Sequence, residues 1–260
     1  LITSVRSRYY RQETCDLINS TVRELNPAYM QFSSFLGGSG SEKGESANLN
    51  YLGDIARDHE GNYAFAARTE SNDFPIKNAY QADFHGEIDV VVGKFSSKGN
   101  LLFSTYFGGS GTEWATDIGF DTDGNIIIAG ITDSTDFPIK NAYQENINAE
   151  NRGSYDIFIT KLSKDGQEII FSTYFGGYSA DWCYALAVSN ENHIAITGTT
   201  YSLDLPVQNA HQNDSRSMAD AYLSFFQPVG QSLVFSTYLG GEKNDQGRGL
   251  AFDSNNAVYI

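Results

Sequence analysis

The stretch Phe103-Ser104-Thr105-Tyr106-Phe107-Gly108-Gly109 decides the fold, because it recurs along the chain. It returns unchanged at residues 171–177, with one substitution at 235–241, and as Phe-Ser-Ser-Phe-Leu-Gly-Gly at 32–38. The phenylalanines that begin the copies are 71, 68 and 64 residues apart (103 − 32, 171 − 103 and 235 − 171). This spacing is too long for a repeat of two helices and suits a unit of several strands. The sequence therefore predicts a repeat protein.

One repeat, residues 115–177, shows what the unit contains. Its β-branched and aromatic runs are separated by clusters of Asp, Gly and Asn, the residues that tight hairpin turns require. The expected strands are residues 115–121, 125–132, 155–163 and 168–175, with turns at 121–125 and 164–167 and a long loop at 133–153. Residues 52–107 and 184–239 follow the same plan. Two more strands are expected at each end, at residues 20–25 and 29–36 and at residues 249–253 and 257–260.

Four antiparallel strands joined neighbour to neighbour form a small twisted sheet with two apolar faces. Packing successive sheets face to face around an axis covers those faces, which predicts an all-β fold, a β-propeller of four-stranded blades. We expect three complete blades and a partial blade at each end. An arc of a larger ring is the favoured arrangement, and a four-bladed ring closed by the terminal strands is the alternative. The expected divisions are a linker and partial blade at 1–28, then repeats at 29–109, 110–177, 178–241 and 242–260.

The composition limits the kinds of molecule that this chain is expected to bind. The chain has 17 Lys and Arg against 32 Asp and Glu, a net charge of −15, which argues against nucleic acid and anionic membranes. No apolar run reaches the roughly 20 residues that cross a bilayer, so membrane insertion is not expected. Cys15 and Cys183 are too few for a disulfide framework, and one bridge or two free thiols both stay open. A surface rich in Asn, Ser, Thr and Tyr favours an extracellular or cell-surface location, and the chain looks trimmed at both ends.

Carboxylates at repeated positions are the first candidate site residues. Asp121 and Asp123 have oxygen ligands at a calcium-like spacing, but no downstream Glu completes the loop, so a hairpin turn is the preferred interpretation. Asp136 precedes a Phe-Pro step, as Asp73 does, and Asp204 precedes Leu-Pro. We expect these three to cap local backbone amides within each loop, with cation binding as the alternative.

Aromatic and glycine residues around the heptapeptide are the second group. Trp114 and Trp182 follow Gly-Gly pairs at corresponding places and are candidates for stacking on a sugar ring, although packing between blades is the favoured role. The Gly-Gly pairs lack the Lys-Ser/Thr of a phosphate-binding loop. We expect these glycines to let the chain pass between sheets without steric conflict. The sequence therefore predicts no catalytic residue and no cofactor, with calcium as the one ion considered.

The order of these blocks resembles the SBBP family of β-propeller repeats. Each heptapeptide is followed by a hairpin, then by Thr-x-Ser-x-Asp-Phe-Pro and Asn-Ala-Tyr-Gln. The matching stretches are residues 69–75 with 78–81, 132–138 with 141–144, and 200–206 with 209–212, with departures at Leu205 and His211. The resemblance covers residues 29–260 and implies a propeller, named as seven-bladed, of the kind found in large exported or surface proteins. It implies no family-wide catalytic residue.

The expected function follows from which loops leave the same end of each sheet. Loops after the second and fourth strands of a meander leave the same end, so the long loops and the Gly-Gly segments should share one face, which we call the long-loop face. Loops on a rigid scaffold carry contacts. The favoured function is a noncatalytic extracellular or cell-surface scaffold that binds a protein or glycan on this face, or a spacer. The alternatives are a carbohydrate-active enzyme with acids from different blades and a structural subunit that assembles through its terminal strands.

Overall fold

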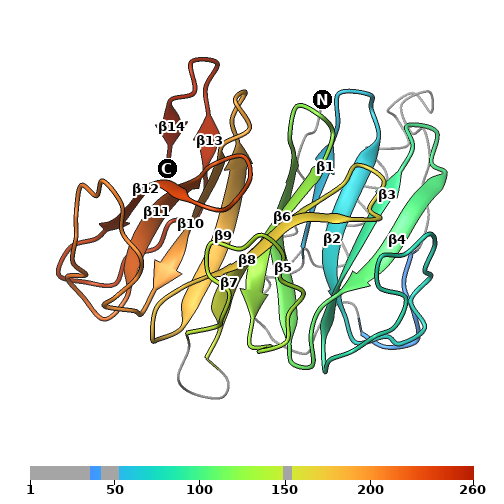
Figure 1. Ribbon diagram of the computed structural model, residues 1–260, viewed down its shortest axis with the longest axis horizontal. Coiled ribbons are helices and arrows are strands. Elements are labelled where there is room, and N and C mark those ends of the chain that lie inside the picture. The colour runs from blue at the N-terminus through green and yellow to red at the C-terminus, as the bar shows by residue number, and fades with distance from the viewer. Residues whose placement is uncertain (1–35, 42–52, 149–153) are drawn as a thin grey trace, which may run out of the picture. The chain divides into compact units, whose positions relative to one another are not determined.

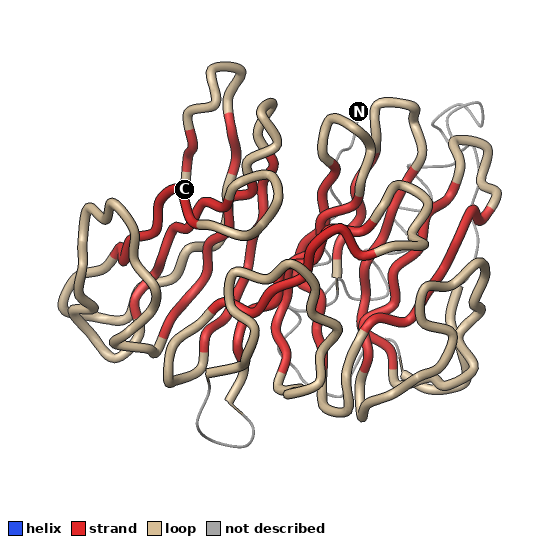
Figure 2. The backbone as a smooth tube through the Cα atoms, viewed as in Figure 1, coloured by secondary structure: helices blue, strands red, loops and turns tan. Residues whose placement is uncertain are grey.

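The computed structural model describes residues 36–41, 53–148 and 154–260 (Figure 1). All of them belong to one of the chain's two units, residues 36–260; the other is residues 1–35. The described residues contain strands and loops but no helix, which confirms the all-β prediction (Figure 2). The strands expected at 20–25 and 29–36, the boundary at residue 28 and Cys15 lie outside the described residues, apart from Leu36, which is not in a strand.

The strands form three four-stranded antiparallel sheets and one two-stranded sheet, each ordered as in the sequence (Figure 1). The first sheet contains β1 (Asp54–Arg57), β2 (Tyr63–Thr69), β3 (Asp89–Phe95) and β4 (Leu101–Phe107). The second contains β5 (Glu113–Phe120), β6 (Ile126–Thr132), β7 (Asp156–Leu162) and β8 (Ile169–Phe175). The third contains β9 (Asp181–Val188), β10 (Ile194–Thr200), β11 (Asp220–Phe226) and β12 (Leu233–Leu239), and the short sheet β13 (Ala251–Phe252) and β14 (Val258–Tyr259). These sheets are the predicted blades.

Tight turns close the hairpins where the sequence predicts them. The turn between the first two strands of each sheet contains a residue with positive φ, a backbone region that glycine and asparagine tolerate best. These residues are Gly61, Gly124, Asn192 and Asn256. The turn between the last two strands uses Gly99, Gly166 and Gly230 in the same way. Both sets of turns lie at one end of the sheets, which we call the tight-turn end.

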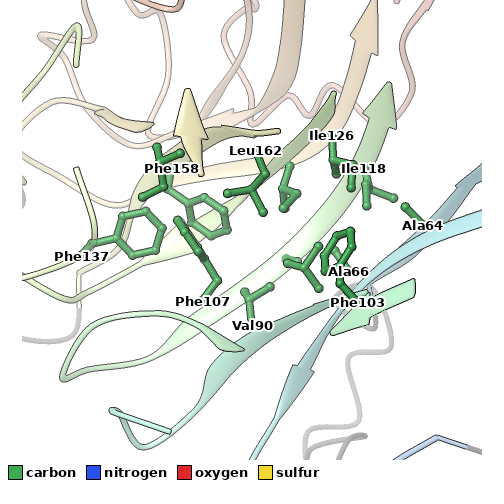
Figure 3. Packing of buried hydrophobic residues seen from close by; sticks show 14 of the residues in the cluster. Ala64, Ala66, Val90, Phe103, Phe107, Ile118, Ile126, Phe137, Phe158 and Leu162 are labelled. Carbon is green, nitrogen blue, oxygen red and sulfur yellow. The ribbon is translucent and has the colours of Figure 1, made fainter. Parts of the chain in front are cut away.

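The middle sheet packs against its two neighbours through alternate residues. Along β6, Ile126 and Ile128 join a core cluster with the first sheet, whereas Ile127 and Ala129 join a cluster with the third. Successive side chains of a strand point to opposite faces, so both faces of this sheet are buried. Figure 3 shows the first of these clusters, with Phe107 of β4 beside Phe137 of the following long loop and Phe158 of β7. Burial of both faces is the packing expected of a blade with a blade on either side.

The long loop that follows the second strand of each sheet covers the outer edge of the fourth strand. In the second sheet, Lys140 and Gln144 pair with Ser172 and Tyr174 of β8. The same bridges join the loop of the first sheet to β4, and Gln208 pairs with Ser236 of β12. An exposed edge strand invites pairing with other chains. The second half of each long loop, which contains Asn-Ala-Tyr-Gln in the first two sheets and Asn-Ala-His-Gln in the third, therefore protects an edge.

Candidate functional site at the blade junctions

The Gly-Gly segment between two blades is held by the long loop of the following blade. The amide and hydroxyl of Ser110 donate to Asp136 Oδ1 at 2.8 and 3.0 Å. The amide of Gly111 donates to Ser134 Oγ at 2.7 Å, and that of Thr112 to Asp133 Oδ1 at 2.6 Å. We call this set of bonds a junction latch. It confirms that the two kinds of loop share one face.

The latch repeats before each of the three four-stranded sheets and corrects one prediction. Asp204 accepts the amide of Tyr178 at 3.0 Å, and Asp73 that of Ser39 at 2.6 Å. These aspartates therefore cap backbone amides, as predicted, but the amides that matter most belong to the preceding connection between blades rather than to their own loops. The bond from the Ser110 amide lowers the pKa of Asp136, with a smaller opposing effect of burial. The sequence order hides this pairing because donor and acceptor are 26 or more residues apart.

Two buried carboxylates flank the first glycine of the pair at two junctions, at Gly108 and at Gly176. Asp156 and Asp181 are both fully buried, and a β-carbon on Gly176 would lie 2.6 Å from Asp156 Oδ1 and 2.8 Å from Asp181 Oδ2. Asp89 and Glu113 flank Gly108 in the same way, so we call these sets carboxylate pairs. The predicted steric need for glycine is confirmed, and its cause is the close approach of these carboxylates.

Burial raises the pKa values of three members of the carboxylate pairs. Loss of solvent raises the pKa of Glu113 to about 7, the hydroxyls of Ser134 and Thr132 oppose the shift, and the charge of Asp89 adds to it. Burial also raises the pKa of Asp181 to about 6 and the pKa of Asp89 above its ordinary value. With these values, Glu113 and Asp181 bind protons near neutral pH. The junctions are therefore places where protonation and blade packing are coupled.

Two other acidic side chains, Asp54 and Asp117, interact on the first strands of two adjacent blades. Asp117 of β5 accepts the amide of Leu186 of β9 at 2.7 Å and interacts with Asp54 of β1. Burial and the neighbouring Asp54 carboxylate raise the pKa of Asp117 to about 7. The third blade has Ala185 at the matching position of β9, so this pair occurs once among the described blades. Asp117 links three first strands through one carboxylate.

The structure assigns the calcium candidate Asp121 to an ion pair. Its Oδ2 lies 2.7 Å from Lys161 Nζ, and its oxygens also accept the amides of Asp123 and Asn125. Burial acts to raise the pKa of Asp121, but the bonds from Lys161 and Asn125 outweigh it and lower the pKa. Asp123 is exposed in the same turn, whereas Asp136 lies at the other end of the blade. The described residues contain no group of three or more metal-ligating side chains.

The two candidate tryptophans meet at the junction of the second and third blades. The rings of Trp114 and Trp182 are 6.2 Å apart, and both contact Tyr155, at 5.6 and 5.5 Å. Arg68 of the first blade lies over Trp114 at 5.3 Å. Both indoles thus pack between blades, as favoured, and stay partly exposed. Binding of a sugar by either tryptophan stays a prediction.

Sequence reasoning missed the carboxylate pairs. Asp89, Asp156 and Asp220 open the third strand of successive blades, and Glu113 and Asp181 open the first strand of the next. An acidic residue directly before a buried apolar run, at the same place in every repeat, was the available signal.

Cys183 is buried and carries a free thiol, and burial raises its pKa to about 12. No helix long and apolar enough to span a bilayer is found in the described part of the chain.

One stretch of the chain matches a known family model. The family model described as SBBP, Beta-propeller repeat, matches residues 102–138. This stretch runs from β4 across the Gly-Gly segment and through β5 and β6 to the Asp-Phe-Pro step, so it contains a whole junction latch. The resemblance to SBBP repeats is confirmed, and the fold is that of a β-propeller repeat protein.

One curated relative covers most of the described blades. Regulatory protein FlaEY of Caulobacter vibrioides is 26% identical over 208 residues, which are 79% of this chain and 20% of FlaEY. The chain thus spans about a fifth of the length of this relative.

Proposed function

We propose that this chain is a noncatalytic β-propeller scaffold, extracellular or at the cell surface, that binds a protein or glycan partner on its long-loop face. The junction latches carry the proposal. They use the recurrent carboxylates and hydroxyls of that face to hold loop backbone in place. The side chains on the latched backbone differ from blade to blade, as those of Ser110 and Tyr178 do. Fixed loops with variable side chains suit recognition, because little conformational freedom is lost on binding.

The description of FlaEY as a regulatory protein supports an interaction role. It concerns a protein of which this chain spans about a fifth, so the partner of FlaEY does not transfer.

A carbohydrate-active enzyme is the second candidate, and the Asp54–Asp117 pair is the observation on its side. Glycoside hydrolysis needs two carboxyl groups about 5 to 9.5 Å apart, with the sugar between them. Asp54 and Asp117 interact directly with each other, whereas a glycosidase keeps its two carboxyl groups apart on either side of the sugar. We assign the pair to the contact between first strands.

The test is binding of the purified protein to a glycan array, with and without calcium, and to a library of displayed random peptides. We expect reproducible ligands from at least one of them. Hydrolysis of a polysaccharide substrate that is lost in Asp117→Asn would replace the proposal with the enzymatic alternative. Absence of any ligand from both libraries would favour the spacer or the structural subunit. Fractionation of cells that express the full reading frame tests the location.

A further inference from the structure

The third blade carries apolar side chains on the long-loop face where the other blades carry polar ones. Tyr178, Tyr201 and Leu203 have exposed fractions of 60%, 40% and 76%. The matching residues of the second blade are Ser110, Asp133 and Thr135, and those of the first blade are Ser39, Glu70 and Asn72. The match is structural, because Tyr178 and Ser110 donate to equivalent latch aspartates. We call Tyr178, Tyr201 and Leu203 the apolar set.

The apolar set is held on two loops that are bonded to each other. The Tyr178 amide donates to Asp204, and the amide of Tyr201 donates to the carbonyl of Ala180 at 3.0 Å. Between them, the Ser179 amide donates to Ser202 Oγ at 2.9 Å. The backbone on both sides of each apolar residue is therefore fixed. Large apolar residues that are exposed on a fixed backbone are typical of protein interaction sites, where Tyr is enriched.

Charge decides the kind of partner. The chain has a net charge of −15, so two copies repel each other, and Asp133 and Asp136 lie at the same end of the adjacent blade. A polypeptide with Lys or Arg beside its apolar side chains would meet complementary charge. A glycan fits less well, because Leu203, the most exposed member, offers only apolar contact and Asp204 Oδ1 already accepts the Tyr178 amide.

We propose that the apolar set on the third blade is a docking surface for a polypeptide segment with aromatic, Leu or Met anchors flanked by Lys or Arg. This inference rests on the proposed scaffold function and names the surface and the chemistry of the partner.

The experiment selects short random peptides on the intact wild-type chain and measures their affinity for two variants. The first, Tyr178→Ser/Tyr201→Asp/Leu203→Thr, places the residues of the second blade at the matching positions of the third. The second is the control Val229→Asp, which makes the same kind of change at the tight-turn end, where Val229 is 55% exposed and matches Asp165. The single variant Leu203→Thr serves if the triple variant does not fold, as judged by its thermal unfolding.

We expect the selected peptides to combine apolar and basic residues and to bind more weakly at higher salt. The triple variant should lose affinity by roughly tenfold or more, and Val229→Asp should bind as wild type. Peptides that bind the triple variant equally well would overturn the docking surface and leave the scaffold function standing. Failure to select any peptide would also overturn it, whereas glycan ligands would still support the scaffold. Self-association of the wild type that the triple variant lacks would identify a second copy as the occupant and contradict the charge argument.

Discussion

At the scale of single residues, glycine and carboxylate occupy the junctions together. At three junctions a side chain on the second glycine of the pair would enter the latch. A β-carbon on Gly177, for example, would overlap Asp204 Oδ1 and lie 2.7 Å from Ser202 Cβ. Gly241 holds the same position after the third blade and has nothing within 4 Å of such a β-carbon. The chain thus contains both a crowded and an open copy of one repeat position.

Replacing Gly177 with Ala should therefore destabilise the protein, whereas Gly241→Ala should have almost no effect. We expect Gly177→Ala to lower the free energy of unfolding by about 1 to 3 kcal/mol, because the added methyl group forces the latch apart. Urea unfolding of both variants measures the difference. Equal stability of the two variants would contradict the role assigned to the latch.

At the scale of the strands and turns, a buried ion pair joins the first turn of a blade to its third strand. Lys94 pairs with Asp58 at 3.0 Å, and Lys161 with Asp121 at 2.7 Å. Each lysine also reaches a turn carbonyl of the next blade. The third blade has Ser189 and Phe225 at the matching positions, so it has lost both partners together. Because a buried charge without its partner is costly, the two positions are coupled.

This coupling predicts a stability rescue. Lys161→Phe alone should lower the free energy of unfolding by about 3 kcal/mol, because it leaves the Asp121 carboxylate buried without its ammonium partner. The double variant Asp121→Ser/Lys161→Phe reproduces the third blade and should recover most of that loss. A double-mutant cycle in urea measures the interaction. Additive losses would show that the two residues act independently.

At the scale of the whole molecule, the carboxylate pairs place proton-binding groups at successive blade junctions. Asp181 and Glu113 have folded pKa values of about 6 and about 7, above their ordinary values. Their contribution to stability is fully present below pH about 4 and is lost as the pH rises through these folded values. Asp58 and Asp121 act in the opposite sense, because their lowered pKa values remove stability as the pH falls. Together these groups predict greatest stability in mildly acidic solution.

The pH profile of unfolding tests this expectation. The wild-type free energy of unfolding should fall between pH 5 and 8, and Glu113 should account for on the order of 3 kcal/mol, from a pKa shift of 4.5 to about 7. Glu113→Gln removes the titrating group and should flatten the profile. Glu60→Gln, at an exposed turn position, is the control and should leave it unchanged. An identical slope in wild type and Glu113→Gln would refute the assignment.

The candidate site was less predictable than the fold. The heptapeptide and the turn glycines predict the blades because their effects are local, and the hairpin turn preferred for Asp121 is local too. The ion pair of Asp121 is not predictable in this way, because its partner Lys161 lies 40 residues away and on another strand (161 − 121). The latch donors of Asp136 and Asp204 were missed for the same reason, since they belong to the preceding connection. Contacts between distant segments leave no local pattern.

The sequence by itself determined the repeating four-stranded unit, its turns and its two apolar faces, because strand periodicity and turn chemistry depend on neighbouring residues. Only the tertiary structure decided that the Gly-Gly pairs pack against buried carboxylates, that the long loops bond to the preceding junction and that Tyr178, Tyr201 and Leu203 gather on one face. Those facts arise where one blade meets the next. The free energy of a buried group depends on its spatial partners, and folding alone brings these together.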